Sequence, residues 1–206
     1  MHMSSGNLDE SRVHKLSDLV NEFGVYLTDT IMLKVFRTEH IRECEDTYGI
    51  ILEFCKNGET YRWGYTSDTA YFPELSEQLK LCDIGILNIS DVYPKDVTGE
   101  KTKHTHLGFD GCKNILDHVK WKVAFVSEFC CMNGDYRHEI VSDLRNTIDN
   151  HDVLVFPAER GLSVSIKGET IRCDFCGQDA DLYSIQCIKP KEEFDEVNYI
   201  CKNCIM

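Results

Sequence analysis

In the stretch Trp63-Gly64-Tyr65-Thr66-Ser67-Asp68-Thr69, an apolar strand ends in two small hydroxyl residues and a carboxylate. An Asp at the end of a strand, held there by backbone and hydroxyl donors, stays ionised and can bind a hard or borderline cation. The same residue can instead begin a turn or cap the following helix, which is common where strands end. Asp68 is therefore the first candidate for chemistry, with turn formation as the alternative.

The residues on both sides of this stretch predict a layered sheet. Asn57-Gly58 is typical of a hairpin turn and leads into the Asp68 strand. From Ile84 onward, strand patterns alternate with helical ones, as in βαβ units, where ligands gather at the carboxyl ends of strands. Asp68, His106 and Glu128 fall at or just beyond such ends. The expected strands are 25–27, 31–36, 47–55, 61–65, 84–89, 122–129, 153–157 and 162–166, and the expected helices are 7–23, 74–81, one from after Gly111 to about Val119, and 135–148.

Composition limits the classes of partner. The chain has 206 residues, enough for one ordinary domain and a small module. Asp and Glu outnumber Lys and Arg 35 to 22, for a net charge of -13. No general attraction to nucleic acid or an anionic membrane is expected, so a nucleic-acid substrate would need a local basic patch. Eleven cysteines without a signal-peptide or transmembrane pattern indicate a reducing compartment, and we expect a cytoplasmic protein.

Two Cys-x-x-Cys pairs near the carboxyl end predict a zinc site. They are Cys173 with Cys176 and Cys201 with Cys204, separated by 24 residues (177–200). Four thiolates at this spacing can close a tetrahedron around a structural Zn²⁺. The alternative, reduced or disulfide-bonded cysteines, is disfavoured by a reducing compartment. Because so small a module buries little apolar core, the metal would supply the energy that folds it. The expected role of the module is docking onto the main domain, a partner or nucleic acid.

The segment from Ile31 to about Ile171 also resembles the second half of the metallo-β-lactamase fold, the αβ/βα sandwich of metallo-hydrolases. His40 follows a strand and precedes Tyr48-Gly49, as a His precedes a Tyr-Gly strand in that family. The segment Thr66-Ser67-Asp68-Thr69 is similar to the family's Ser/Thr-Gly-Asp-Thr, whose Asp bridges two metal ions.

Two later segments continue the resemblance in the same order. Leu81-Cys82-Asp83-Ile84-Gly85-Ile86-Leu87-Asn88 is similar to the family's "Cys or Ala, Asp, apolar strand, Asn or Glu" segment. His106-Leu107-Gly108 and its helix look like the His-Ser/Leu-Thr segment of the ribonuclease Z branch.

The main family signature, His-x-His-x-Asp-His, has no counterpart ahead of Ile31. His104-x-His106 with Asp110 imitates part of it, but this segment follows the Asp68 strand instead of preceding it, and Gly111 stands where the signature has His, so a displaced copy is the disfavoured reading. The last family ligand, a His, aligns with Glu128, which can ligate Zn or Mn or instead cap the next loop. His40 is either a ligand or substrate contact, or a structural residue.

The resemblance implies an α/β fold: half of a metallo-β-lactamase-type sandwich with a small zinc-ribbon module at its carboxyl end. The expected parts are a tail and helix (1–24), the half domain (25–168) and the Cys₄ ribbon (169–206). The implied function is metal-dependent hydrolysis of a phosphodiester or another ester, including nucleic-acid or nucleotide substrates. Asp68 would bridge Zn or Mn ions, with Glu128 and His40 as further ligands, and His106 would donate a proton or stabilise charge.

Because half of the metal ligands are absent, the resemblance implies the second half of a longer protein or one subunit of a split enzyme. We expect a homodimer or a partner chain that supplies the first half and covers the exposed side. Two other functions stay open: a non-catalytic relative that keeps the fold for binding, and a zinc-ribbon adaptor whose larger domain is a scaffold. A parent chain containing His-x-His-x-Asp-His would favour the hydrolase.

Overall fold

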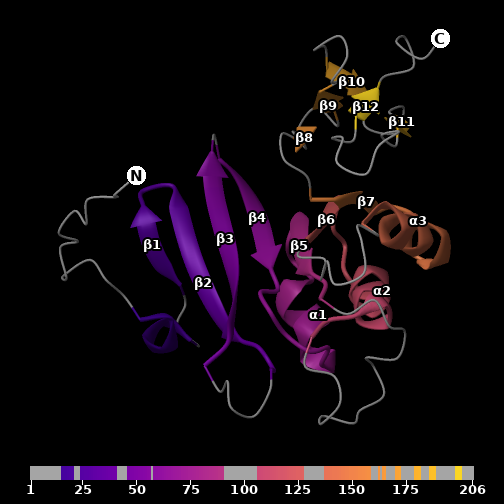
Figure 1. Ribbon diagram of the computed structural model, residues 1–206. Coiled ribbons are helices and arrows are strands. Elements are labelled where there is room, and N and C mark those ends of the chain that lie inside the picture. The colour runs from indigo at the N-terminus through magenta and orange to yellow at the C-terminus, as the bar shows by residue number, and fades with distance from the viewer. Residues whose placement is uncertain are drawn as a thin grey trace, which may run out of the picture.

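The computed structural model describes residues 15–20, 24–40, 46–56, 58–90, 106–127 and 137–158, together with residue 162 and short strands beyond it. Its central feature is a seven-stranded sheet in the order β1-β2-β3-β4-β5-β6-β7 (Figure 1). The strands are β1 (Val25–Thr28), β2 (Ile31–Arg37), β3 (Tyr48–Lys56), β4 (Glu59–Tyr65), β5 (Ile84–Asn88), β6 (Val123–Ser127) and β7 (Leu154–Pro157). The helices are α1 (Pro73–Leu79), α2 (Phe109–His118) and α3 (Arg137–Thr147).

The sheet has an antiparallel part and a parallel part. Strands β1 to β4 follow one another as antiparallel neighbours, and Gly58 in the β3–β4 turn has φ 79°, a conformation that Gly adopts readily. Strands β4 to β7 are parallel, and α1, α2 and α3 form the successive crossovers. The mixed α/β sheet expected from the sequence is therefore confirmed.

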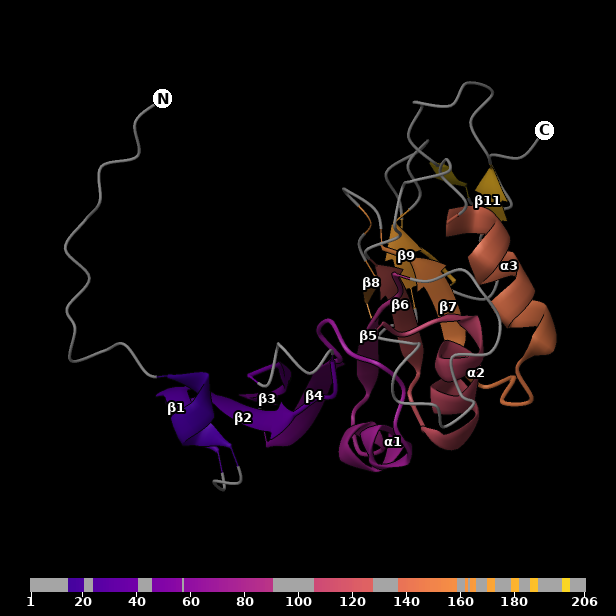
Figure 2. The ribbon, with the colours of Figure 1, turned by 60° about the horizontal axis from the view of Figure 1, so that its bottom comes forward.

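The three helices build one apolar core against one face of the sheet. It includes Leu79 of α1, Leu116 of α2 and Leu144 of α3, all fully buried. Figure 2 shows α2 and α3 beside β6 and β7. A Cβ at Gly85 of β5 would lie 1.8 Å from Cζ3 of Trp121, so only glycine at this position leaves room for the indole to pack on the strand. The indole Nε1 in turn donates to Leu79 O at 2.9 Å, which fixes α1 on the sheet.

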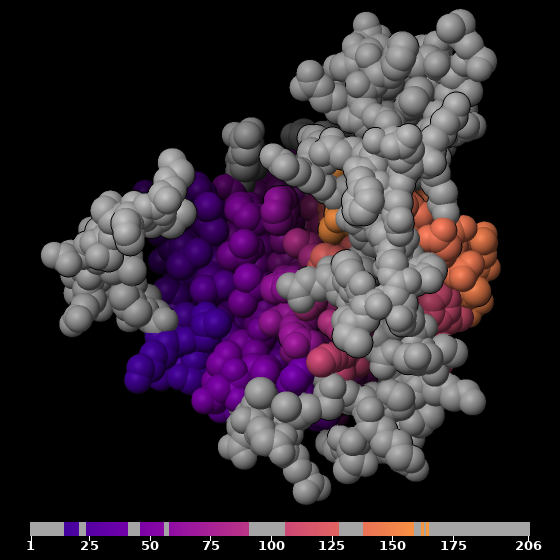
Figure 3. Space-filling view, viewed as in Figure 1, coloured from indigo at the N-terminus to yellow at the C-terminus, as the bar shows by residue number. Residues whose placement is uncertain are grey.

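The opposite face of the sheet is also apolar. The strand registers place alternate residues of neighbouring strands on this face, and Trp63 of β4 is 43% exposed. Within the described part of the chain, Leu162 and Val164 pack here against a smaller buried cluster of Ile84, Val123 and Phe156. Figure 3, from the same side as Figure 1, shows β1 to β4 as one continuous surface. The residues on the opposite face are Ile31, Leu33, Val35, Ile50, Leu52, Phe54, Tyr61, Trp63, Tyr65, Ile84, Ile86, Val123, Phe125, Leu154 and Phe156.

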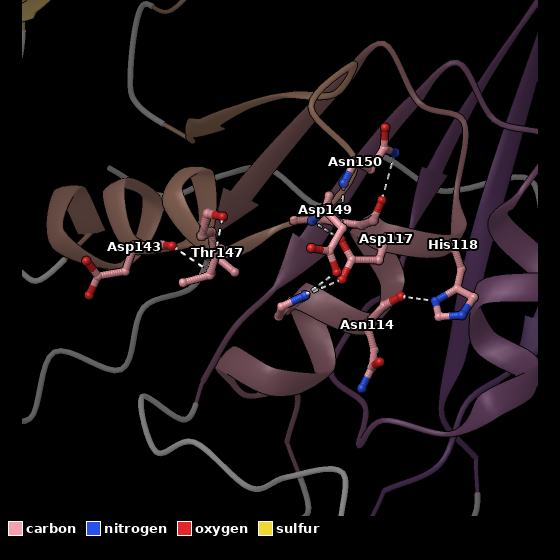
Figure 4. Close-up of polar contacts among 10 residues, drawn as sticks. Asn114, Asp117, His118, Asp143, Thr147, Asp149 and Asn150 are labelled. Carbon is pink, nitrogen blue, oxygen red and sulfur yellow. Dashed lines mark hydrogen bonds and ion pairs between the residues drawn. The ribbon is translucent and has the colours of Figure 1, made fainter.

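A polar cluster joins α2 to the loop before β7 (Figure 4). Asp117 Oδ1 accepts the backbone N–H groups of Asp149 at 2.7 Å and Asn150 at 3.4 Å, and its other oxygen pairs with Lys113. The Asn150 amide donates to the carbonyls of Leu116 and Val119, both at 2.9 Å. The Asn150 bonds supply partners for carbonyls at the end of α2 that have none within the helix, and the Asp117 bonds attach the helix to the loop.

The helix expected over residues 7–23 is wrong in its described part. Only a short 3₁₀ helix forms, η2 (Leu16–Leu19), and Val20 is extended with ψ 133°. Val20 forms a parallel bridge with Val35 of β2, so pairing with the sheet replaces a further helical turn. A β-branched residue suits this extended position. The rest of 7–23 up to residue 14, and residues 21–23, lie outside the described residues.

Beyond β7 the described segments are short strands in two further sheets. One contains β8 (Val164–Ser165), β9 (Thr170–Arg172) and β10 (Asp179–Asp181); the other contains β11 (Gln186–Ile188) and β12 (Asn198–Ile200). The four cysteines of the expected zinc ribbon all lie outside the described residues. The ribbon and its boundary at 169 therefore stay predictions.

Candidate metal site

The topology brings several strand ends to one edge of the sheet. Strands β4, β5, β6 and β7 run parallel, and β2 is parallel to β4 because each is antiparallel to β3. His40 follows the carboxyl end of β2, and Asp68 follows the carboxyl end of β4. His106 lies three residues before α2, near the end of the connection from β5 to α2. The three side chains therefore come from separate segments that meet at this edge of the sheet.

His40, Asp68 and His106 form a cluster of metal-ligating groups. His40 Nε2 lies 3.2 Å from Asp68 Oδ2, and His106 Nδ1 lies 3.8 Å from Asp68 Oδ1. The two imidazole ring centroids are 4.9 Å apart. One ligand atom from each residue can be chosen so that all three lie within 4.8 Å of one another. Two imidazoles and a carboxylate at this separation suit Zn²⁺ or Mn²⁺.

Three polar atoms of His40 and Asp68 lack hydrogen-bond partners in the described part of the chain. Asp68 Oδ1 and both ring nitrogens of His40 are buried and have no hydrogen-bond partner among the described residues. Nε2 of His40 is close enough to Asp68 Oδ2 for an ion pair, but the two groups are not aligned as a hydrogen bond. Buried polar atoms are nearly always paired, so this arrangement fits a site that a cation completes.

Exposure differs among the three side chains in a way that bears on their roles. The side chain of His40 is 11% exposed, that of His106 is 32% exposed and that of Asp68 is 47% exposed. His40 therefore closes the protein side of the site, whereas Asp68 and His106 face its open side. Among these three, a substrate entering from solvent would meet Asp68 and His106.

The backbone beside Asp68 is held in an uncommon conformation. Ser67 has φ 59°, in the left-handed region, and is the only such non-Gly residue in the described part of the chain. Left-handed backbone is unfavourable for a residue with a Cβ, and it occurs often at functional sites. The aligned family motif has Gly here, so Ser67 keeps the turn despite losing the residue type that favours it.

Two buried threonines hold the Asp68 loop. The Thr66 backbone N–H donates to Ile86 O at 3.1 Å, and Thr66 Oγ1 accepts the Asn88 backbone N–H at 3.0 Å, so the loop is attached to β5. On the other side, Thr69 Oγ1 accepts the Glu39 backbone N–H at 3.2 Å. Sequence reasoning did not assign a role to either threonine, although both flank Asp68 in the motif.

His106 is positioned by the residues that follow it. Leu107 is fully buried and forms a parallel bridge with Ile89, just beyond β5. The backbone N–H of Ser90 donates to Leu107 O at 3.2 Å. The chain then enters α2 after Gly108. The segment is thus pinned beside β5 directly after His106, which keeps the imidazole near the Asp68 loop.

The other expected site residues are placed as follows. Glu128 directly follows Ser127, the last residue of β6, but lies outside the described residues, as does His104. Asp110 lies in the first turn of α2 and does not belong to the three-residue cluster. The structure therefore brings together His40, Asp68 and His106 and leaves Glu128 a prediction.

Comparison with known proteins identifies the fold. No protein-family model matches the chain, and no curated protein matches its sequence. A solved structure, the metallo-β-lactamase fold protein YhfI from Bacillus subtilis, matches over 65% of this chain and 48% of its own, with 13% identity and a TM-score of 0.50. The chain thus has the metallo-β-lactamase fold in the matched part, as expected.

Two further solved structures match with lower TM-scores. Human tRNase Z, short form, matches over 69% of this chain and 46% of its own, with 13% identity and a TM-score of 0.45. Igni18, a metallo-hydrolase from the archaeon Ignicoccus hospitalis, matches over 66% of this chain and 54% of its own, with 14% identity and a TM-score of 0.45. The chain spans about half the length of each of these three solved structures.

No helix in the described ranges is long and apolar enough to cross a membrane.

Proposed function

We propose that this chain contributes half of the active centre of a metal-dependent hydrolase that cleaves a phosphodiester or a related ester, in a nucleic acid or nucleotide. The observation that carries this proposal is the His40–Asp68–His106 cluster, whose ligand atoms lie within 4.8 Å of one another while several of them lack hydrogen-bond partners among the described residues. The metallo-β-lactamase fold of the matched part supports it, and so does the position of the cluster at the edge where parallel strands end.

A bound Zn²⁺ or Mn²⁺ supplies Lewis acidity and a nucleophile at neutral pH. Asp68 contributes the anionic ligand, with its two oxygens facing His40 and His106 respectively. His40, which is largely buried, supplies an imidazole ligand and keeps water off the protein side of the site. His106 is more exposed, so its ring can reach a substrate and move a proton to a leaving oxygen. Glu128 is proposed as a further ligand.

The proposed enzyme is completed by a second polypeptide segment, either in a longer parent chain, in a partner chain or in a second copy of this chain. The support is the apolar sheet face opposite the helices, on which Trp63 is 43% exposed. An apolar sheet face of this kind is normally covered by another layer. The segment that covers it would supply the His-x-His-x-Asp-His ligands that this chain lacks.

The last residues are proposed to form a separate structural zinc ribbon through Cys173, Cys176, Cys201 and Cys204. The support is the spacing of the two Cys-x-x-Cys pairs. A closed Cys₄ site has no open position, so it takes no part in hydrolysis. The proposed location of the protein is the cytoplasm, where such thiols stay reduced.

The proposal is tested by metal content and by hydrolysis, measured together. The full chain is purified, and bound metal is measured with and without a chelator. More than one metal equivalent per chain is expected, since the ribbon accounts for one. Little hydrolysis of bis(p-nitrophenyl) phosphate is expected from the chain alone, and activity is expected once the first half is supplied.

His106→Ala then separates the roles of the cluster. In the completed enzyme it should lower turnover by about 100-fold or more, as for loss of a general acid, while the metal stays bound. Loss of metal to the same extent as in a ligand variant would make His106 a ligand instead. One metal equivalent per chain and no activity in the completed protein would leave a non-catalytic relative or a zinc-ribbon adaptor.

A further inference from the structure

Thr69 joins the two segments that carry His40 and Asp68. Its side chain is fully buried, and its Oγ1 accepts the Glu39 backbone N–H at 3.2 Å. The same Oγ1 lies 3.0 Å from Glu39 O and 2.8 Å from Ala70 O, and its single proton can be given to one of these carbonyls. The hydroxyl therefore always accepts from Glu39 and completes its bonding within the same two segments.

The backbone strengthens this connection on the other side of Glu39. The Ala70 N–H donates to Glu39 O at 2.6 Å. Both polar groups of the Glu39 backbone are thus bound by the residues that directly follow Asp68. Glu39 is the residue before His40, so its backbone orientation determines where the His40 ring lies relative to the Asp68 carboxylate.

We propose that Thr69 is a positioning residue, whose hydroxyl holds the Glu39–His40 backbone against the Asp68 loop so that His40 and Asp68 face one cation. This inference rests on the proposed metal site and names the group that sets its geometry. Groups behind metal ligands fix ligand orientation, and their removal typically weakens metal binding 10–100-fold. Thr69 acts through His40 and does not touch the cation.

The chain offers a matched control in Thr38. This threonine is also buried and lies two positions before His40, but its Oγ1 has no hydrogen-bond partner among the described residues. Replacing either threonine by Val removes a hydroxyl and keeps the branched shape. Thr69→Val removes the acceptor for Glu39, whereas Thr38→Val removes a hydroxyl with no such bond. Thr69→Ser keeps the hydroxyl and serves as a second control.

The experiment uses the full 206-residue chain and Mn²⁺ alone as the probe. Imidazole and carboxylate groups accept Mn²⁺, whereas thiolates select softer metals, so the cysteines contribute little. Binding is followed by the paramagnetic broadening of the His40 and His106 ring signals in NMR spectra. Exchange of the Glu39 amide proton is measured in the metal-free protein, as a readout that needs no cation.

Thr69→Val is expected to weaken Mn²⁺ binding at least about tenfold, and Thr69→Ser and Thr38→Val to stay within about threefold of the wild type. The Glu39 amide should exchange about tenfold faster in Thr69→Val than in Thr69→Ser. Mn²⁺ binding by Thr69→Val within threefold of the wild type would overturn the proposal. So would an equal loss in Thr38→Val.

The amide measurement keeps the inference testable if Thr69→Val does not fold. A Glu39 amide that exchanges at the rate of an unstructured chain in the wild type would then overturn it. The same measurement distinguishes failure of the proposed function from failure of the role assigned to Thr69. If the wild type does not bind Mn²⁺ at His40 and His106, the proposed function fails, while a protected Glu39 amide still shows that Thr69 holds the two segments together.

Discussion

Two polar clusters in this molecule differ in how far the surrounding protein supplies partners for their atoms. In the Asp117 cluster, carboxylate oxygens accept two backbone N–H groups and pair with Lys113, and the Asn150 amide finds two carbonyls (Figure 4). In the His40–Asp68–His106 cluster, Asp68 Oδ1 and both His40 nitrogens have no hydrogen-bond partner among the described residues.

The difference separates a structural role from a chemical one. A satisfied cluster stabilises the fold by supplying partners for the end of a helix. A cluster that leaves buried polar atoms without partners costs stability, and it persists where a ligand supplies the missing interactions. Ser67, with φ 59° beside Asp68, adds to that cost. Substitutions in the first cluster should therefore change unfolding, and substitutions in the second should change metal binding.

The largest expected effect is that of Asp68→Asn, which keeps the shape of the side chain and removes its charge. Mn²⁺ binding at the cluster should weaken by about 100-fold or more, beyond the range for groups behind the ligands. Hydrolysis by the completed enzyme should be lost. Urea unfolding should change little, because the Asp68 side chain is about half exposed. A large loss of stability with unchanged Mn²⁺ binding would show that Asp68 has a structural role and would contradict the assigned metal site.

The next effect is that of Asp117→Ala. The backbone N–H groups of Asp149 and Asn150 would lose their acceptor, at a cost of about 1–3 kcal/mol in the free energy of unfolding. Urea denaturation measures the loss, and Mn²⁺ binding should not change. Asp149→Ala is the matched control, because that carboxylate is exposed and lies 3.4 Å from Lys113. It should change stability by no more than about 0.5 kcal/mol.

The smallest effect is a pH dependence of stability at Asp117. Burial works to raise the pKa of this carboxyl, but Lys113 and the backbone N–H groups of Asp149 and Asn150 outweigh it and hold the pKa below its usual value of 3.8. A depressed folded pKa contributes stability above the unfolded pKa, and this is lost as the pH falls through the folded value. Urea midpoints measured from pH 6 down to about 2 should therefore fall less steeply below about pH 4 for Asp117→Asn than for the wild type. Parallel curves would contradict the assignment.

Much of the fold could be predicted from local patterns. The Asn57-Gly58 hairpin signal and the apolar run of β5 each depend on neighbours within a few residues. The expected helix over 7–23 failed where Val20 pairs with Val35, because a long-range bridge replaced a local preference. For the site, the motif around Asp68 identified the carboxylate, and the sequence also indicated His40 and His106. Their closeness could not be derived from spacing alone.

By itself, the sequence determined the order of strands and helices from β1 to β7, the place of Asp68 at a strand end, and a pattern of cysteines typical of a zinc ribbon. Local hydrogen-bonding preferences and side-chain periodicity suffice for these. Only the tertiary structure decided that His40 and His106 flank Asp68, that Asp68 Oδ1 and both ring nitrogens of His40 have no hydrogen-bond partner among the described residues, and that Thr69 holds Glu39 across 30 positions of the chain. These features depend on how distant segments pack against one another, and no local pattern encodes that packing.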